Sequence, residues 1–304
     1  MEKTGFLEQY FSTPPDESRS VVQPLNDALF IQKKVEVAVK RDDLIHPFVS
    51  GNKWRKLKYN LAYCFQNRIS SILTFGGAHS NHIYATAAAG KMFGIKTIGI
   101  IRGDELADLN NTTLDFARYC GMNLIFVTRD EYRLRTNNEY LDSLQKEYPH
   151  TLILPEGGTN EHAIQGCEEI YSNAEKEHYD YFLQMVGTCG TFAGVLKASL
   201  PRNVIIGISA LKGSFIDDDA KRVLNENGII NENYKILNQY HHGGYAKSNQ
   251  ELDDFIMGFT DKHGIPVEHV YTGKLFWALY DMIKNDYFPE KSKIMVLHSG
   301  GLRA

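Results

Sequence analysis

The stretch SSILTFGGAHSNHIYATAAAGKMFGIKTIGII, residues 70–101, contains the pattern that decides the fold. Residues 70–75 form a short apolar run that ends in a glycine turn, which predicts a buried strand. An alanine-rich helix is predicted over residues 83–92, and the apolar residues 96–101 predict the next strand. A strand, a helix and a strand in this order favour parallel strands that are joined by a right-handed crossover.

The same alternation continues toward the C-terminus. Further strands are predicted at residues 123–127, 151–154, 181–186, 203–209 and 294–297. Helices are predicted near residues 113–119, 132–148 and 163–171. The Asp- and Asn-rich residues 217–233 are expected to form a surface excursion. We therefore expect an α/β fold with two sheets rather than one, and a break between the halves near residues 156–159.

The composition excludes several classes of protein. The 304 residues are 43% hydrophobic and 23% charged, which is typical of a globular chain with a sizeable core. There are 33 Lys and Arg against 37 Asp and Glu, and the net charge of −4 argues against a general nucleic-acid coat. The longest apolar runs are no longer than strands, so we expect no membrane span. Residues 1–20 lack the features of a signal peptide, so a cytoplasmic location is expected.

Cysteines and histidines are not spaced as metal ligands. The 4 cysteines are scattered without a C-x-x-C pair, so we expect reduced thiols. No carboxylate stands at ligand spacing from His79 and His82, or from His241 and His242, and H-E-x-x-H is absent. The sequence therefore predicts no metal site.

Four glycine-marked turns each follow a predicted strand or open a predicted helix. They lie at residues 50–53, 76–81, 187–191 and 299–301. Glycines often do no more than mark turns. In parallel sheets, however, the turns after the carboxyl ends of the strands form the ligand crevice, and four of them with polar neighbours favour a site.

The turn GTCGTFAG, residues 187–194, follows a predicted strand and opens an apolar helix. Backbone amides converging at a helix N-terminus suit a phosphate, and Thr188 and Thr191 supply further donors. The absence of Gly-Lys-Ser/Thr excludes a P-loop, and the spacing excludes the dinucleotide fingerprint. The pattern alone leaves phosphate binding and tight helix–strand packing equally open.

Ser80 and Asn81 stand directly before the alanine-rich helix. Their spacing favours simple capping of that helix. The alternative is a carboxylate pocket formed by the amides of residues 77–81 and the Ser80 hydroxyl.

Lys53 opens the basic helical stretch KWRKLK, in which Lys56 and Lys58 are expected to be solvated. A lysine amine becomes a nucleophile toward aldehydes when desolvation or nearby cations lower its pKa, and Arg41 and Arg55 are near Lys53 in sequence. Together with a phosphate loop, such a lysine indicates pyridoxal phosphate.

Several motifs in one order resemble a known family. They are KRDDLIHP at residues 40–47, SGNKWRKL at 50–57, GGAHSNH at 76–82, PEGGTN at 155–160, the 187–194 turn, VYTGK at 270–274 and HSGG at 298–301. The chain resembles the 1-aminocyclopropane-1-carboxylate deaminase / D-cysteine desulfhydrase family of pyridoxal-phosphate enzymes, whose fold is the tryptophan-synthase-β type (fold type II). The resemblance spans residues 40–301.

The resemblance implies two domains, each with a mainly parallel twisted sheet flanked by helices, and the cofactor in the cleft between them. The large, cofactor-binding domain is expected to comprise residues 1–56 and 160–304, and the small domain residues 57–159. It further implies a small amino-acid substrate and a homodimer, with neither nucleic acid nor membrane as partner.

The resemblance also assigns roles to residues. Lys53 would hold the cofactor and later move a proton, and Asn81 would bind the cofactor's phenolic oxygen. Ser80 would bind the substrate carboxylate and assist proton abstraction, with Gly77, Asn81 and His82 beside it. The phosphate would be bound by Gly187, Thr188, Cys189, Gly190 and Thr191. Tyr271 and Tyr245 would face the substrate, and the match at Tyr245 is the weakest.

Two positions bear on the substrate. Members of the family that open the cyclopropane tend to carry Glu and Leu where this chain has Thr272 and Ser299, whereas D-cysteine desulfhydrases carry Thr or Ser. A neutral hydroxyl near the cofactor ring makes a weaker electron sink, which suffices to eliminate a thiolate. We therefore expect β-elimination from D-cysteine, with cyclopropane deamination as the alternative. A non-catalytic binding protein is a third interpretation, against which intact Lys53, Ser80 and Asn81 argue.

The chain departs from the family pattern in two places. Tyr84 stands where members often have Arg. Few residues follow Gly301, so the closing helix of many members is expected to be short or absent. Either departure bears on the shape of the pocket.

Overall fold

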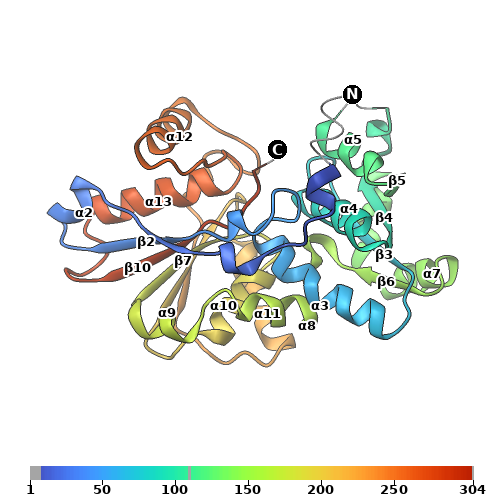
Figure 1. Cartoon of the computed structure of the whole chain (residues 1–304), viewed down its shortest axis with the longest axis horizontal. Coiled ribbons are helices and arrows are strands. Elements are labelled where there is room, and N and C mark those ends of the chain that lie inside the picture. The colour runs from blue at the N-terminus through green and yellow to red at the C-terminus, as the bar shows by residue number, and fades with distance from the viewer. Residues whose placement is uncertain (1–7, 109–110, 303–304) are drawn as a thin grey trace. The chain divides into compact units, whose positions relative to one another are not determined.

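The computed structural model of the chain describes residues 8–108 and 111–302 and divides into two compact units (Figure 1). Unit 1 comprises the described part of Met1–Pro15, together with His46–Val49 and Lys53–Gly166. Unit 2 comprises Asp16–Ile45, Ser50–Asn52 and the described part of Cys167–Ala304.

The units and the predicted domains differ at their boundaries. The sequence predicts residues 1–56 with 160–304, and residues 57–159. Helix α3, Asn52–Gln66, accounts for one difference, because its buried Leu57 and Leu61 belong to the core of unit 1 and a helix moves as one rod. At the other boundary, a Cβ atom at Gly166 would overlap the carbonyl oxygen of Arg55, so α8 (Glu161–Glu168) packs closely on α3 near its C-terminal end.

The sheet of unit 1 has four strands among the described residues, in the order β5-β4-β3-β6, and each neighbouring pair is parallel. The strands are β3 (Ser71–Gly76), β4 (Lys96–Arg102), β5 (Asn123–Val127) and β6 (Thr151–Leu154). Each matches a predicted strand, so these predictions are confirmed. All six residues of β3 are buried, as expected of a strand that is covered on both faces.

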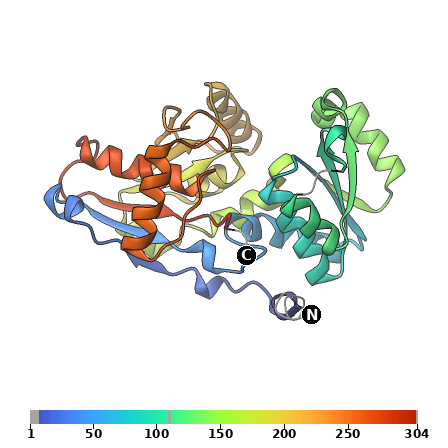
Figure 2. The same cartoon turned by 90° about the horizontal axis from the view of Figure 1, so that it is seen from above.

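Alternate residues of β3 face two separate cores, because side chains along a strand alternate between its faces. Ile72 packs in the core that includes α3, α4 and α5, whereas Leu73 and Phe75 pack with Tyr132 and Leu144 of α6 and α7. Figure 2 shows helices on both sides of this sheet. The helices are α4 (Asn81–Phe93), α5 (Thr112–Tyr119), α6 (Arg129–Arg133) and α7 (Asn138–Glu147). The single helix predicted at residues 132–148 is wrong, because Asn137 is extended and caps α7 as a new helix.

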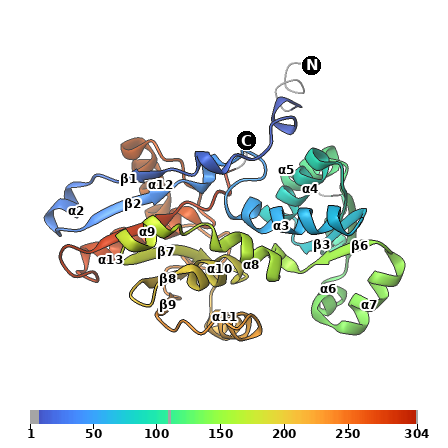
Figure 3. The ribbon, with the colours of Figure 1, turned by 60° about the horizontal axis from the view of Figure 1, so that its bottom comes forward.

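The sheet of unit 2 has six described strands in the order β1-β2-β10-β7-β8-β9 (Figure 3). They are β1 (Val22–Pro24), β2 (Glu36–Lys40), β7 (Tyr181–Val186), β8 (Val204–Ser209), β9 (Tyr234–Leu237) and β10 (Lys293–Leu297). Strand β1 is antiparallel to β2, and the other pairs are parallel. The predictions of β7, β8 and β10 are confirmed. Strands β1, β2 and β9 were not predicted, because they are short and contain Pro24, Glu36 and the exposed Lys235, respectively.

Among the described helices of unit 2, only α10 stands at a position that the sequence predicted. The helices are α2 (Ala28–Gln32), α9 (Asn173–His178), α10 (Gly190–Ala198), α11 (Phe215–Glu226), α12 (Gln250–His263) and α13 (Thr272–Lys284). The surface excursion predicted at residues 217–233 is wrong as far as Glu226, because Ile216, Ala220, Val223 and Leu224 form a buried helical stripe. Within the described residues, no helix combines the length and the apolar character needed to cross a membrane.

Candidate active site

Helix α3 carries two lysines in its first two turns. Lys53 is half-buried and belongs to unit 1. Lys56 was predicted to be solvated, and this prediction is wrong, because its side chain is only 2% exposed. Its ammonium donates to the Gly157 carbonyl oxygen at 2.8 Å and to the Thr159 hydroxyl at 3.1 Å. The turn after β6 therefore compensates the buried charge of Lys56.

An asparagine pair fastens the same turn to α3. Asn60 donates to the Asn160 amide oxygen at 3.1 Å, and Asn160 donates to the Asn60 oxygen at 2.7 Å. Asn160 also accepts a hydrogen bond from the Ala163 amide at 2.9 Å and so caps α8. The PEGGTN motif of the sequence is thus held in place by α3.

Ser80 is the N-cap of α4. Its hydroxyl oxygen accepts from the amides of His82 and Ile83 at 3.2 and 3.3 Å, which confirms the predicted capping. The turn before it is tight, because a Cβ atom at Gly76 would lie 2.5 Å from Ile83 Cγ1. Gly77 is less restricted, since a Cβ atom there would meet only Arg102, at 3.7 Å. The serine hydroxyl retains its own proton for donation to a ligand.

His82 is buried beneath the first turn of α4. His82 Nε2 and Thr74 Oγ1 are hydrogen-bonded at 2.9 Å, and Thr74 Oγ1 also lies 3.1 Å from the Leu154 carbonyl oxygen. The other ring nitrogen of His82, Nδ1, has no hydrogen-bond partner among the described residues. Burial, together with the charges of Lys53 and Lys56, holds the pKa of His82 well below its ordinary value. The ring is therefore neutral.

The same imidazole explains a glycine of the PEGGTN motif. Gly158 has a φ of 68°, and a Cβ atom there would lie 2.5 Å from His82 Cε1. Both the backbone conformation and the close approach of the ring therefore require glycine at this position.

In unit 2, the turn Gly187–Thr191 joins β7 to α10. Cys189 is left-handed, with a φ of 58°, and the Gly190 amide donates to the Thr188 carbonyl oxygen at 2.8 Å. Unlike α4, α10 has no side-chain cap among the described residues. A Cβ atom at Gly187 would meet no described atom within 4 Å outside its chain neighbours. The turn combines amides at a helix start with open space beside them, as a bound anion requires.

Residues 50–52 connect two glycine motifs of unit 2. Asn52 donates its side-chain amide to Thr191 Oγ1 at 3.0 Å and its backbone amide to the Ser299 carbonyl oxygen at 3.2 Å. Gly51 has a φ of 57°, and a Cβ atom there would overlap Ser299. The structure thus brings the SGN, GTCGT and HSGG motifs together.

The start of α13 is stabilised by an acidic residue. Glu268 accepts from the amides of Val270, Tyr271 and Thr272 at 2.6, 3.0 and 2.9 Å. The buried Thr272 hydroxyl donates to Glu268 Oε1 at 3.2 Å and accepts from the Glu268 amide at 3.0 Å. The Thr272 hydroxyl is therefore bonded within its own turn.

Tyr245 and Tyr271 lie together in unit 2. Their ring centroids are 5.9 Å apart at an interplanar angle of 69°, an edge-to-face contact. Tyr245 is 40% exposed and Tyr271 half-buried. Tyr245, whose match to the family is the weaker, thus contacts Tyr271, which the sequence assigned to the same site.

The predicted site residues are divided between the two units. Unit 1 contains Lys53, Gly77, Ser80, Asn81 and His82, and unit 2 contains Gly187, Thr188, Cys189, Gly190, Thr191, Tyr245, Tyr271, Thr272 and Ser299. Sequence reasoning missed Lys56, Asn60 and Glu268. Lysines in a basic helical stretch are usually solvated, and nothing in the spacing of Glu268 marks it as a cap.

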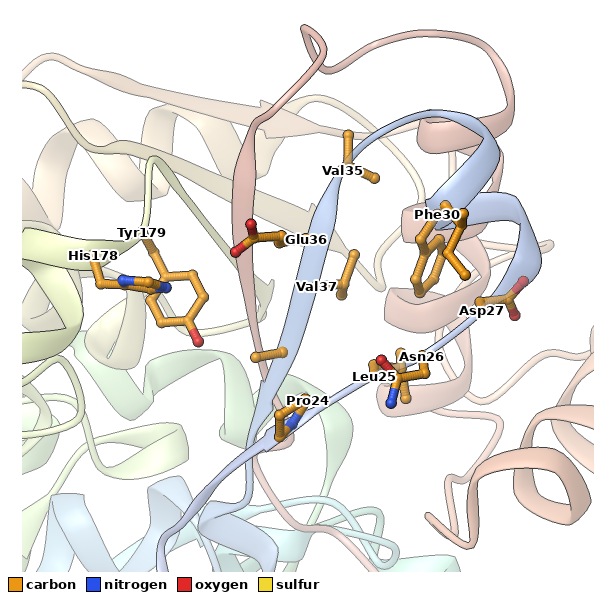
Figure 4. A pocket seen from close by; sticks show the side chains of 12 residues that line it. Pro24, Leu25, Asn26, Asp27, Phe30, Val35, Glu36, Val37, His178 and Tyr179 are labelled. Carbon is orange, nitrogen blue, oxygen red and sulfur yellow. The ribbon is translucent and has the colours of Figure 1, made fainter.

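One cavity, of about 360 Å³, lies elsewhere in unit 2 (Figure 4). Its lining includes Pro24, Asp27, Glu36, His178 and Tyr179, and none of the predicted site residues. The Asp27 carboxylate already accepts from Lys262 and Tyr280, both at 2.6 Å. Within the described residues, no group of three or more His, Cys, Asp or Glu side chains is placed to hold a metal ion.

Comparison with known proteins agrees with this geometry. The sequence profile described as "Pyridoxal-phosphate dependent enzyme" matches residues 22–300. A Pyrococcus abyssi protein, named a candidate 1-aminocyclopropane-1-carboxylate deaminase, is 30% identical over 283 residues, which cover 88% of this chain and 85% of that protein. The Arabidopsis thaliana protein named a bifunctional D-cysteine desulfhydrase/1-aminocyclopropane-1-carboxylate deaminase is 27% identical, covering 88% of this chain and 72% of that protein.

Solved structures show the same fold. The structure of an ACC deaminase homologue has a TM-score of 0.78 and 25% identity, and covers 97% of this chain and 94% of its own. Serine racemase from Dictyostelium discoideum, at 15% identity, a TM-score of 0.66 and coverage of 94% and 95%, supports the fold alone. The expected fold type II architecture, two parallel-rich sheets flanked by helices, is confirmed. The chain belongs to the pyridoxal-phosphate dependent enzymes, in the 1-aminocyclopropane-1-carboxylate deaminase / D-cysteine desulfhydrase family, and is a lyase that uses pyridoxal 5'-phosphate.

Proposed function

We propose that this lyase catalyses β-elimination from D-cysteine or a related small D-amino acid, giving pyruvate, sulfide and ammonia. The observation that carries the proposal is the neutral residue at position 272, a buried threonine whose hydroxyl is bonded to Glu268. No carboxylate side chain is present at position 272 to hold a proton on the cofactor ring. The alternative is 1-aminocyclopropane-1-carboxylate deamination to 2-oxobutanoate and ammonia.

The turn Gly187–Thr191 fits the phosphate of the cofactor. Amides at the start of α10, with no described side-chain cap, favour a dianion, and the space at Gly187 admits it. In the proposal, Gly187, Thr188, Cys189, Gly190 and Thr191 bind this phosphate. Asn52 holds the Thr191 hydroxyl oxygen and so orients its proton toward the ligand.

The residues of unit 1 are proposed to act on the substrate. Lys53 holds the cofactor covalently and then moves the proton at the substrate α-carbon. Asn81 binds the phenolic oxygen of the cofactor. Ser80 donates its hydroxyl proton to the substrate carboxylate, with the amides from Gly77 onward beside it. His82 stays neutral there, because a proton would place a third positive charge beside Lys53 and Lys56.

Residues of unit 2 complete the proposed chemistry. The cofactor, when bound, supplies an electron sink for the charge left at the α-carbon. Ser299 would offer the bound cofactor a neutral hydroxyl rather than a carboxylate, and a cofactor ring without a carboxylate partner would be a weaker electron sink. Such a sink suffices when the leaving group is a thiolate, which departs readily. Tyr245 and Tyr271 are proposed to line the side of the site that receives it.

The test is 2-oxo acid release by the cofactor-loaded enzyme, offered D-cysteine and 1-aminocyclopropane-1-carboxylate in parallel. Pyruvate with equimolar sulfide from D-cysteine alone is the expected result. Release of 2-oxobutanoate from the cyclopropane, without sulfide from D-cysteine, would replace the proposal by its alternative. The homodimer and the cytoplasmic location stay predictions, and light scattering of the loaded enzyme measures the first.

A further inference from the structure

The segment 240–247, which carries Tyr245, has an unusual backbone. Four of its residues have positive φ: 46° at His242, 94° at Gly243, 120° at Gly244 and 53° at Ala246. For the non-glycine residues His242 and Ala246 this backbone conformation is strained. Such a segment keeps its shape only where its surroundings hold it.

Helix α13 provides those surroundings through contacts that run in reverse order along one helix face. Two of the contacts are hydrogen bonds: the Tyr240 hydroxyl donates to the Asp281 carboxylate at 2.9 Å, and the Lys274 ammonium donates to the Gly244 carbonyl oxygen at 2.8 Å. The other two are edge-to-face ring contacts, with centroids 4.7 Å apart for His242 and Trp277 and 5.9 Å apart for Tyr245 and Tyr271. Spacings of three and four residues place these partners on one face of the helix. The segment is thus docked along α13 from end to end.

Lys274 is the charged member of this series. Its side chain is 0% exposed, and its ammonium donates to the Gly244 carbonyl oxygen. Burial lowers the pKa of Lys274, while the nearby Glu268 raises it. A buried ammonium needs its hydrogen-bond partner, and a carbonyl bonded to a charged donor is held more firmly than by a neutral one. Gly244, the residue so held, directly precedes Tyr245.

We propose that Lys274 is a positioning residue, which sets the place of the Tyr245 ring by holding the Gly244 carbonyl against α13. The proposal deepens the proposed function and rests on it to the extent that Tyr245 faces the substrate. Because Tyr271 opens the same helix, one rigid element then fixes both tyrosines relative to each other. The loop geometry itself is independent of which substrate the enzyme takes.

Hydrogen exchange of residues 240–247 tests the geometry without turnover. Lys274→Met keeps the length of the side chain and removes the donor, and we expect exchange in this segment to rise about tenfold while α10 and β7 stay protected. Lys274→Arg keeps a charged donor and should restore most of the protection. Lys284→Met, the same change at an exposed lysine of α13, should leave exchange as in the unchanged protein.

Steady-state kinetics and absorbance of the loaded enzyme test the consequence. Lys274→Met and Tyr245→Phe should each lower kcat, and the double variant should be no worse than the poorer single one. The visible absorbance of the bound cofactor should remain, since Lys53 is untouched. Multiplicative losses in the double variant would contradict the proposal. If Tyr245→Phe leaves kcat unchanged, the role of Tyr245 in the proposed function fails, while exchange still decides the role of Lys274.

Two results in the exchange experiment would overturn the inference: unchanged exchange in Lys274→Met, or a rise that is equal throughout unit 2. Should Lys274→Met not fold, Gly244→Ala decides instead, because alanine cannot readily adopt a φ of 120° in this surface loop. Local release of residues 240–247 with α13 protected is then expected, and an unaffected segment would refute the anchoring.

Discussion

Helices α4 and α10 begin after similar turns, but their first backbone amides have different hydrogen-bond partners. Each follows a parallel strand and a glycine turn, β3 for α4 and β7 for α10. The first amides of α4 are bonded to the Ser80 hydroxyl, whereas α10 has no described side-chain cap and open space at Gly187. A helix start whose amides are already bonded has less to offer an anion. The two helix starts therefore differ in the side-chain cap, which is Ser80 at α4, and not in the presence of glycines.

Lys53→Ala should have the largest effect, because it removes the covalent attachment without touching either helix start. We expect kcat to fall about 10³-fold or more, with loss of the visible absorbance of the lysine-bound cofactor. Lys58→Ala, at a neighbouring lysine of α3, is the matched control and should keep both. A retained absorbance in Lys53→Ala would assign the attachment to another lysine.

Gly187→Val and Gly76→Ala should separate the two turns. Valine fills the open space beside α10, so cofactor affinity should fall about 100-fold while the melting temperature of the cofactor-free protein stays unchanged. Alanine at Gly76 meets Ile83 and should destabilise the protein by about 1–3 kcal/mol. Cofactor titration and thermal unfolding of both variants measure this. Equal effects of the two changes on affinity would remove the distinction between the turns.

Ser80→Ala and Ser172→Ala compare two serine caps. Ser172 caps α9 with Glu175 in a capping box, and each substitution should cost about 1 kcal/mol of unfolding free energy. Only Ser80→Ala should also lower kcat/KM, by about tenfold, with the cofactor still bound. Steady-state kinetics beside denaturant unfolding separate the two effects. Equal kinetics of the two variants would make Ser80 a cap and nothing more.

The start of α13 is a third helix start, and here the carboxylate of Glu268 accepts hydrogen bonds from the first amides. Thr272→Glu with Ser299→Leu should shift the preference toward the cyclopropane substrate, by about tenfold at most. Adding Glu268→Gln should enlarge the shift, because it removes the like charge beside the new carboxylate. The ratio of kcat/KM values for the two substrates is the measurement. An unchanged ratio in both variants would show that these positions do not set the reaction.

His82 predicts a modest acid sensitivity. Its pKa is lowered in the folded protein, so below about pH 6.5 the unfolded chain binds a proton that the folded chain does not. The contribution of His82 to the free energy of unfolding is therefore complete above that pH. It is lost as the pH falls further, by about 1.4 kcal/mol per pH unit. His82→Gln should show a shallower loss between pH 7 and about pH 5.5, whereas the exposed His178→Gln should follow the unchanged protein. A parallel loss in all three proteins would contradict this account.

Much of the fold was predictable from local pattern. The strands β3 to β8 are short apolar runs with helices between them. Such runs are typical of parallel strands, because helices cover both faces of a parallel sheet. Strand β2, with Glu36 and Lys40 at its ends, has no such pattern and is specified by its pairing with β10. Helix α11 was missed because its apolar stripe is narrow and acidic residues stand between the apolar positions in the sequence.

The candidate site was predictable where a motif carried it. Ser80, Lys53 and the Gly187 turn stand in motifs whose order could be read directly. Glu268 was missed although it is a local cap, whose partners are the amides of the residues two to four positions further along the chain. Lys56 could not be recognised, because its partner Gly157 lies 101 positions away and approaches it only through packing. Residue type and spacing do not encode such approaches.

The most direct test of the central claim is a crystal structure of the protein with pyridoxal 5'-phosphate bound. The account predicts the phosphate against the amides of Gly187–Thr191 at the start of α10, with Ser80 still capping α4. A phosphate bound at the start of α4 instead, with Ser80 displaced from its cap, would contradict it.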